Sequence, residues 1–220
     1  LPTFIPLALY GLLALTSTLF SEHPSFGLKG MHEQFESIFV ILGYCLLVYY
    51  AYLFIDTEED IKFLFRYFLI GIAVMIVIGL LQFTGNDPFG ADFGKKLYLP
   101  KEYWNQLDSF GLAFGDRMVY LTLYNPNYAG LYTGFILPII TGLLLTEHRK
   151  KQIIEYSIVI IGLILCLIGS KSKAGFIGLL ISLIFVVIFF RKYIFRNKVV
   201  TISLIGVGVL AMAFLFIIKG

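Results

Sequence analysis

Residues 126–145 read PNYAGLYTGFILPIITGLLL, a run of twenty residues without a charged side chain. A helix needs about 20 mostly apolar residues to cross a bilayer. Asn125 and Pro126 form a typical helix start, because Asn accepts from a free amide and Pro needs no amide partner at the first position. Gly130 and Gly134 permit close contact with a neighbouring helix. This stretch therefore predicts a membrane-spanning helix that packs against others.

Apolar runs of similar length precede and follow this helix. The chain is 59% hydrophobic and 14% charged, whereas soluble domains carry about 25% charged residues. Backbone groups in lipid must be satisfied within the protein, and the runs lack the strict alternation of barrel strands. We therefore predict an all-α transmembrane helical bundle, a single domain over residues 1–220. The bundle is expected to contain about seven spans, near residues 1–20, 37–55, 64–83, 126–145, 153–169, 174–190 and 199–218.

Two short connections, residues 147–151 and 191–198, are rich in Lys and Arg. Short basic loops tend to stay in the cytoplasm, so these two connections are predicted to be cytoplasmic. The acidic connection at residues 56–63 joins them by parity, and its Thr57 and Asp60 have the spacing of a capping box. The remaining connections, residues 21–36, 84–124 and 170–173, are then expected on the outer side.

The outer loop at residues 84–124 is far longer than a usual connection, and such loops tend to be either functional or disordered. Its many aromatic residues, including Phe93 and Trp104, favour a segment at the membrane interface over disorder. The same loop carries Arg117, eight residues before Asn125. For its lysines, contact with lipid phosphates and binding of a ligand both remain open; these are Lys95, Lys96 and Lys101.

The turn at residues 170–173 repeats the features of the helix start at Asn125. Ser172 can cap the following helix, and Lys171 and Lys173 flank it. Helix N-termini present free N–H groups and a partial positive charge, which favours anions. The two lysines either extend to the interface or, together with Arg117, bind one anion. A lipid-linked pyrophosphate at the outer leaflet is the ligand that we expect in the second case.

Other classes of site find no support in the sequence. Cys45 and Cys166 lie within apolar runs without metal-ligand spacing, so neither a disulfide nor a metal site is expected. No nucleotide-binding or catalytic-triad motif appears. The basic residues are not clustered as in nucleic-acid binders, so no nucleic-acid partner is expected. The sequence thus predicts a membrane protein that works without a cofactor.

Four stretches, in order along the chain, resemble motifs of the O-antigen ligase and O-antigen polymerase superfamily. These are membrane glycosyltransferases that use undecaprenyl-pyrophosphate-linked glycans. The stretches are residues 30–36, IGLLQFTGNDP at 78–88, Arg117 with NPNYAG at 125–130, and SKSKAG at 170–175. The resemblance implies an enzyme that transfers an oligosaccharide from this carrier to a glycan, lipid or protein acceptor. The reaction would occur at the outer face of a bacterial plasma (inner) membrane, in cell-surface polysaccharide biosynthesis.

The resemblance also implies roles for individual residues. Arg117 and Lys173 take the places of two catalytic arginines that hold the donor pyrophosphate, although Lys173 lacks the bidentate fork of Arg. Residues expected to assist in substrate binding are Lys171, Ser172, Asn125, Asn127, Lys95 and Lys96. The family has a further outer loop after spans like these, so we expect this chain to be part of a longer protein.

Two other functions remain as alternatives. A transporter or flippase of lipid-linked glycans would need charged residues within the spans, or inverted repeats with broken helices. Neither feature is evident in the sequence. A non-catalytic membrane scaffold would be favoured if the outer cations proved freely replaceable.

Overall fold

The computed structural model describes residues 4–30, 37–111, 114–115, 117–195, 206, 208–209 and 213. The regular secondary structure of these residues is helical, which confirms the all-α class. The predicted span at 199–218 lies largely outside the described residues, as do residues 31–36 of the first family-like stretch. The helices form two compact units, residues 1–68 and residues 69–220. We describe each unit separately.

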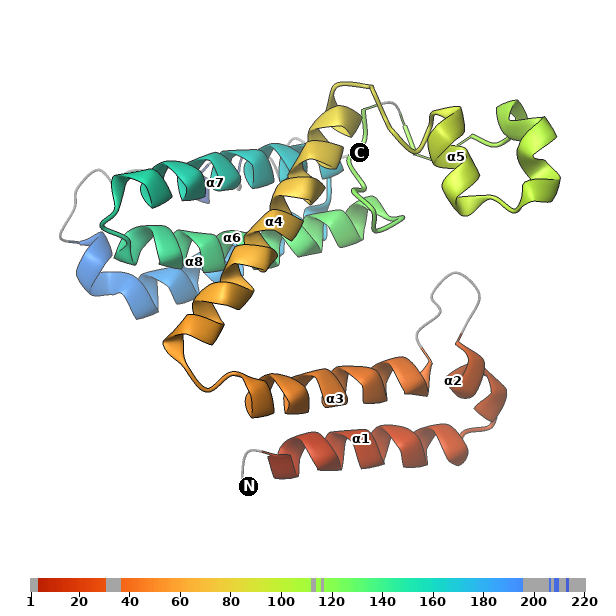
Figure 1. Cartoon of the computed structure of the whole chain (residues 1–220), viewed down its shortest axis with the longest axis horizontal. Helices are drawn as coiled ribbons and strands as arrows, with labels where there is room; N and C mark the ends of the chain where they lie inside the picture. The colour runs from red at the N-terminus through yellow and green to blue at the C-terminus, as the bar shows by residue number, and fades with distance from the viewer. Residues whose placement is uncertain are drawn as a thin grey trace. The chain divides into compact units, whose positions relative to one another are not determined.

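The first unit contains a helical hairpin of α1 (Phe4–Leu19) and α3 (Ile38–Phe54), with the short helix α2 (Pro24–Lys29) at the turn (Figure 1). Phe4 packs its ring edge-on against Tyr52, with 4.7 Å between ring centroids, so the start of α1 meets the end of α3. The sequence did not predict α2. At 16 and 17 residues, α1 and α3 are shorter than the other apolar helices of the chain.

Helix α4 (Glu58–Phe83) begins with the predicted capping box. The Asp60 carboxylate accepts from the Thr57 amide at 2.9 Å, and the Asp60 amide donates to the Thr57 hydroxyl at 3.2 Å. This reciprocal pair satisfies two amides that the first helical turn leaves without partners. The helix therefore begins at Glu58, six residues before the predicted span at residue 64. Its first turn is acidic rather than apolar.

The second unit is built around α6 (Pro126–Thr146), α7 (Lys150–Ser170) and α8 (Lys173–Ile194), which lie side by side in Figure 1. Helix α7 runs back along α6 before α8 begins, so α6 and α8 run parallel, and α6 contacts both of the other helices. In the described part of the chain, α4, α6, α7 and α8 are long and apolar enough to cross a membrane.

Glycines bring α6 and α8 into close contact. A Cβ atom on Gly175 would lie 2.6 Å from the carbonyl carbon of Gly130, and one on Gly134 would lie 2.9 Å from the carbonyl oxygen of Gly175. Lipid tails are as apolar as the helices, so dispersion contacts at short range are a main source of helix association in membranes. The predicted packing role of Gly130 and Gly134 is confirmed.

The C-terminal half of α4 packs on α7 through a second set of small residues. The Ile76 side chain fills the space where Gly162 lacks one, and the Cys166 sulfur lies over Gly79. Buried Ile72 and Leu163 belong to the same apolar core. This packing places the end of α4 beside the end of α7.

The loop at residues 84–124 contains α5 (Asp92–Tyr98) and the 3₁₀ helix η1 (Lys101–Ser109), both visible in Figure 1. The Lys95 ammonium donates to the Leu107 carbonyl at 2.8 Å, and the Trp104 indole N–H donates to the Leu99 carbonyl at 3.2 Å. These bonds join the two short helices into one α5–η1 segment.

Candidate functional site

A polar pocket of about 540 Å³ lies where α4 ends and the chain approaches α6. Its walls come from the last turn of α4, the residues that follow it, α5 and described residues between 110 and 120. They combine cationic, anionic, amide and aromatic side chains. The side chains in its walls include Gln82, Asp87, Lys95, Phe114, Arg117 and Tyr120.

Gln82, in the last turn of α4, organises this pocket although it is 1% exposed. Its Oε1 atom accepts from the amides of Tyr120 and Leu121 at 3.1 and 2.8 Å. Its Nε2 atom donates to the Leu121 carbonyl at 3.0 Å. Buried backbone groups are costly to leave unpaired. The Gln82 side chain therefore supplies hydrogen-bond partners that these backbone groups of the loop would otherwise lack.

Asp87 lies between the side-chain amide of Gln82 and the phenol of Tyr120. Its Oδ1 atom accepts from the Phe89 amide at 3.1 Å and lies 3.4 Å from Gln82 Nε2. Its Oδ2 atom accepts from the hydroxyl of Tyr120. Burial, together with the hydrogen bond and the negative charge of Asp87, raises the pKa of Tyr120 above its ordinary value. The phenol therefore stays protonated and keeps donating at neutral pH.

Arg117 lies in the pocket wall over the turn that follows α4. That turn has Gly85 at a φ of 85°, and a Cβ atom there would lie 3.8 Å from Arg117 Nε. The side chain is exposed, and no carboxylate among the described residues forms an ion pair with it. A guanidinium presents a planar set of donors that suits phosphate oxygens.

The backbone before α6 is strained. Arg117, Leu121 and Tyr124 have φ angles of 60°, 56° and 63°, in the left-handed region that residues with a Cβ adopt at some cost. Such strain persists only where surrounding contacts hold it, and it clusters at functional sites. The Gln82 hydrogen bonds to Tyr120 and Leu121 are contacts of this kind.

The two predicted helix caps are confirmed. Asn125 Oδ1 accepts from the Asn127 amide at 2.8 Å at the start of α6. Ser172 Oγ accepts from the Gly175 amide at 3.0 Å at the start of α8. Ser172 is also 1% exposed, so its hydroxyl serves the helix start rather than an open surface.

Both helix starts lie at the same end of the bundle as the pocket. The Val119 amide donates to the Gly169 carbonyl at 3.0 Å, which ties the segment after Arg117 to the end of α7. A Cβ atom on Gly130, in the first turns of α6, would meet the Ser172 side chain. We call this end of the bundle, where α4 and α7 end and α6 and α8 begin, the pocket end.

The structure groups only part of the predicted site. Arg117 and Lys95 line the same pocket. Lys171 and Lys173 are exposed at the pocket end beside the start of α8, and they do not line the pocket. Lys96 lies over the Trp104 ring, 5.6 Å from its centroid, and also lies outside the lining. The remaining predicted residues, Asn125, Asn127 and Ser172, form the helix starts and are absent from the lining too.

Sequence reasoning missed three of the residues that build the pocket: Gln82, Asp87 and Tyr120. Gln82 and Asp87 lie within the family-like stretch at 78–88, but no role was assigned to either. The available signal was a lone amide at the end of an apolar run, where an unpaired polar group would be expensive. Tyr120 carried no comparable signal among the other aromatic residues of the loop.

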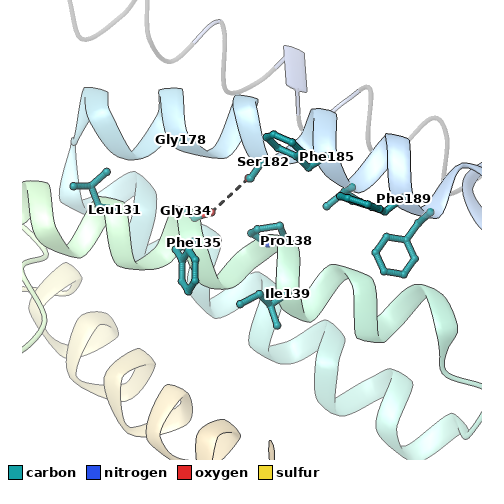
Figure 2. A pocket seen from close by; sticks show the side chains of 11 residues that line it. Leu131, Gly134, Phe135, Pro138, Ile139, Gly178, Ser182, Phe185 and Phe189 are labelled. Carbon is teal, nitrogen blue, oxygen red and sulfur yellow. Dashed lines mark hydrogen bonds between the residues drawn. The ribbon is translucent and has the colours of Figure 1, made fainter. Parts of the chain in front are cut away.

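An apolar groove of about 470 Å³ runs between α6 and α8, as Figure 2 shows. The Ser182 hydroxyl lies 3.5 Å from the Gly134 carbonyl at its floor. Among the described residues, no ionisable side chain lines the groove. It can accommodate hydrocarbon, whereas the polar pocket can bind charge. Side chains of this groove include Leu131, Phe135, Ile139, Phe185 and Phe189.

The pocket combines an ammonium, a carboxylate and a guanidinium that has no ion-pair partner among the described residues, at the end of helices long and apolar enough to cross a membrane. A guanidinium and an ammonium in one pocket can bind an anionic group such as a phosphate. Comparison with protein-family models, with curated proteins and with solved structures finds no match for this chain.

Proposed function

We propose that this chain binds the pyrophosphate of a polyprenyl-pyrophosphate-linked glycan and acts in transfer of the glycan to an acceptor, as an O-antigen ligase or polymerase does. The observation that carries the proposal is Arg117, which lies without a carboxylate partner among the described residues in the wall of a polar pocket. That pocket adjoins the ends of helices long enough to span a membrane. A lipid-borne phosphate would therefore find a cation at the depth of its own headgroup.

Glycosyl transfer needs stabilisation of the leaving group more than it needs a cofactor. An acceptor hydroxyl oxygen attacks the anomeric carbon and its proton passes to water. The bond from that carbon to the pyrophosphate oxygen breaks, and the pyrophosphate leaves with the electron pair. Preorganised cations stabilise this developing charge. Arg117 would bind two phosphate oxygens and Lys95 would supply a second positive charge. The carboxylate of Asp87 would hold Tyr120 and the pocket wall in place.

Lys171 and Lys173 would act beside the pocket rather than in it. Both are exposed at the pocket end, where the α8 N-terminus adds partial positive charge. They would attract the anionic donor to this surface and contact it before transfer. The proposal places the pocket end on the outer side of a bacterial inner membrane, in a protein with about seven spans.

The first test measures binding of farnesyl pyrophosphate, a short isoprenoid pyrophosphate, to the purified chain in detergent. Loss of a charge-assisted hydrogen-bonded contact weakens binding by roughly 10- to 100-fold, and we expect this for Arg117→Ala. Arg149→Ala is the matched control, because Arg149 pairs with Glu147 at the opposite end of α6 and α7. Equal affinity of the Arg117→Ala and Arg149→Ala proteins would contradict the proposal.

The second test distinguishes transfer from transport. Cells that depend on this protein are assayed for the transferred glycan and for the carrier-linked glycan at the outer face. A transferase variant, Arg117→Ala, should lose the product while the carrier-linked glycan accumulates outside. A transporter variant should leave that glycan inside. Buried polar residues described within α6, such as Thr133, bond to their own helix backbone, which favours transfer over a polar transport path.

A further inference from the structure

Helix α5 has two different faces. Gly94 is buried against the backbone of Pro88 and Phe89, where a Cβ atom would lie 1.9 Å from the Pro88 carbonyl oxygen. Lys95, one position on, donates to the Leu107 carbonyl and lines the polar pocket. At about 100° per residue, Lys95 lies about 160° around the helix from both Phe93 and Leu97, and Gly94 lies between the two sides. The contacts of Gly94 and Lys95 hold α5 against the pocket.

The opposite side of α5 is apolar and uncovered. Phe93 and Leu97 are 73% and 66% exposed. Residues four positions apart on a helix are neighbours on one face, so these two side chains form a continuous apolar ridge. Lys96 lies on the flank of the ridge, three positions from Phe93, and its ammonium sits over the Trp104 ring.

The adjoining part of η1 has the residue types that favour a membrane interface. Trp104 and Tyr103 are exposed, with a polar group at one end of each ring system. Trp and Tyr are enriched where a membrane meets water. The Trp104 indole N–H is already bonded to the Leu99 carbonyl, so the ring can enter the headgroup region without an unpaired donor.

The chain tethers this surface to the plane where α4 ends. Only residues 84–91 separate the end of α4 from the start of α5. The segment 92–109 carries three lysines and three carboxylates, namely Lys95, Lys96 and Lys101 against Asp92, Glu102 and Asp108. Because its formal charge is zero, burial of apolar side chains rather than attraction to anionic lipid must drive its binding.

We propose that the α5 ridge, with Trp104 beside it, docks into the phospholipid headgroup and acyl boundary at the pocket end. The partner is the bilayer in which this protein resides. Docking through Phe93 and Leu97 fixes the height of Lys95, on the other side of the same helix, relative to the membrane. This inference does not depend on the proposed function, since it concerns membrane contact alone.

The test uses Trp104, which is the single tryptophan of the sequence. The full chain is reconstituted into zwitterionic phosphatidylcholine vesicles with bromine atoms either near the carbonyl end or near the methyl end of the acyl chains. An interfacial indole should lose roughly half of its emission to the shallow bromines and much less to the deep ones. If neither brominated lipid quenches Trp104, and aqueous acrylamide has full access to it, the proposal is overturned.

Variants then identify the side chains that dock. Phe93→Ser with Leu97→Ser should reduce quenching by the shallow bromines about twofold, because the ridge no longer enters the membrane. Phe93→Leu should retain it. Asp92→Asn is the matched control, because Asp92 is an exposed residue of the same helix outside the ridge, and it should also retain the quenching. An unchanged quenching ratio in the double variant, with an unchanged melting temperature, would show that the ridge does not dock.

Discussion

Gln82 pairs with both backbone groups of Leu121, accepting from its amide at 2.8 Å and donating to its carbonyl at 3.0 Å. The two residues are 39 positions apart in the sequence. Leu121 has a φ of 56°, so the side chain of one helix holds a strained loop residue in place. Arg117 lies four residues earlier in that loop, and its position in the pocket wall depends on the same clamp.

Replacing Gln82 with Leu should therefore destabilise the protein. The change keeps the volume of the side chain but leaves the amides of Tyr120 and Leu121, and the Leu121 carbonyl, without partners. Each unpaired buried group costs about 1–3 kcal/mol, less where the loop relaxes toward water. We expect a loss of about 3 kcal/mol in apparent unfolding free energy, measured by denaturation in detergent.

Gln152→Leu is the matched control for this change. Gln152 Oε1 is buried and has no hydrogen-bond partner among the described residues. Removing it should leave stability unchanged or slightly higher, since burial of an unpaired polar atom is unfavourable. Equal effects of the two Gln→Leu substitutions would contradict the stabilising role of the Gln82 hydrogen bonds.

The contact between α6 and α8 should tolerate no side chain at Gly175. Gly175→Ala would bring a Cβ atom to 2.6 Å from the Gly130 backbone. Overpacking of this kind costs about 1–3 kcal/mol, so the melting temperature in detergent should fall. Gly178→Ala, one turn further along α8, meets nothing within 4 Å. It should be neutral or stabilise, by up to about 1 kcal/mol, because Ala favours helix.

A single cysteine at residue 117, 171 or 173 should react from one side of the membrane. The hydrogen bond between Val119 and Gly169 ties the Arg117 segment to the turn that holds both lysines. In a background with Cys45→Ala and Cys166→Ala, an impermeant maleimide should label Arg117→Cys, Lys171→Cys and Lys173→Cys from outside intact cells. Lys151→Cys, at the opposite end of α7, should react only after permeabilisation. Labelling of Arg117→Cys and Lys173→Cys from opposite faces would rule out a shared ligand.

Tyr120 should make stability fall at high pH. Burial raises its pKa above the ordinary value of 10.0, and the hydrogen bond to Asp87 acts in the same direction. Its contribution is fully present below pH 10, and it is lost as the pH rises from about 10 toward the folded-state pKa. Tyr120→Phe should remove this part of the alkaline decline. The unfolding free energy of both proteins is measured by denaturation between about pH 9 and 12. An identical decline in the two proteins would contradict this role of Tyr120.

Glu147 should contribute only weakly to the stability of the protein against acid unfolding. Hydrogen bonds from the Arg149 side chain and backbone lower the pKa of Glu147 to about 2. A depressed carboxyl pKa contributes stability that is present above the ordinary value of 4.5 and is lost as the pH falls toward 2. The Arg149 side chain is 70% exposed, so solvent screens the interaction. Glu147→Gln should change the acid midpoint of unfolding only slightly, and a large shift would contradict this geometry.

Amino-acid sequence alone determined the features that depend on neighbouring residues. Apolar runs marked α4, α6, α7 and α8, and caps at Asn125 and Ser172 located two helix starts. These signals are local, because a helix satisfies its own backbone and its caps lie within a few residues. The capping box at Thr57 and Asp60 also located the start of α4 at Glu58, six residues before its apolar run begins.

Only the tertiary structure decided which of the polar residues meet. It brought Lys95 and Arg117 into one pocket and left Lys171 and Lys173 beside it. It also revealed Gln82 as the residue that holds the loop. Such pairings join positions tens of residues apart and follow from how glycines such as Gly130 and Gly175 let whole helices approach. Residue spacing along the chain does not predict which helices approach each other, because that approach arises from packing between helices.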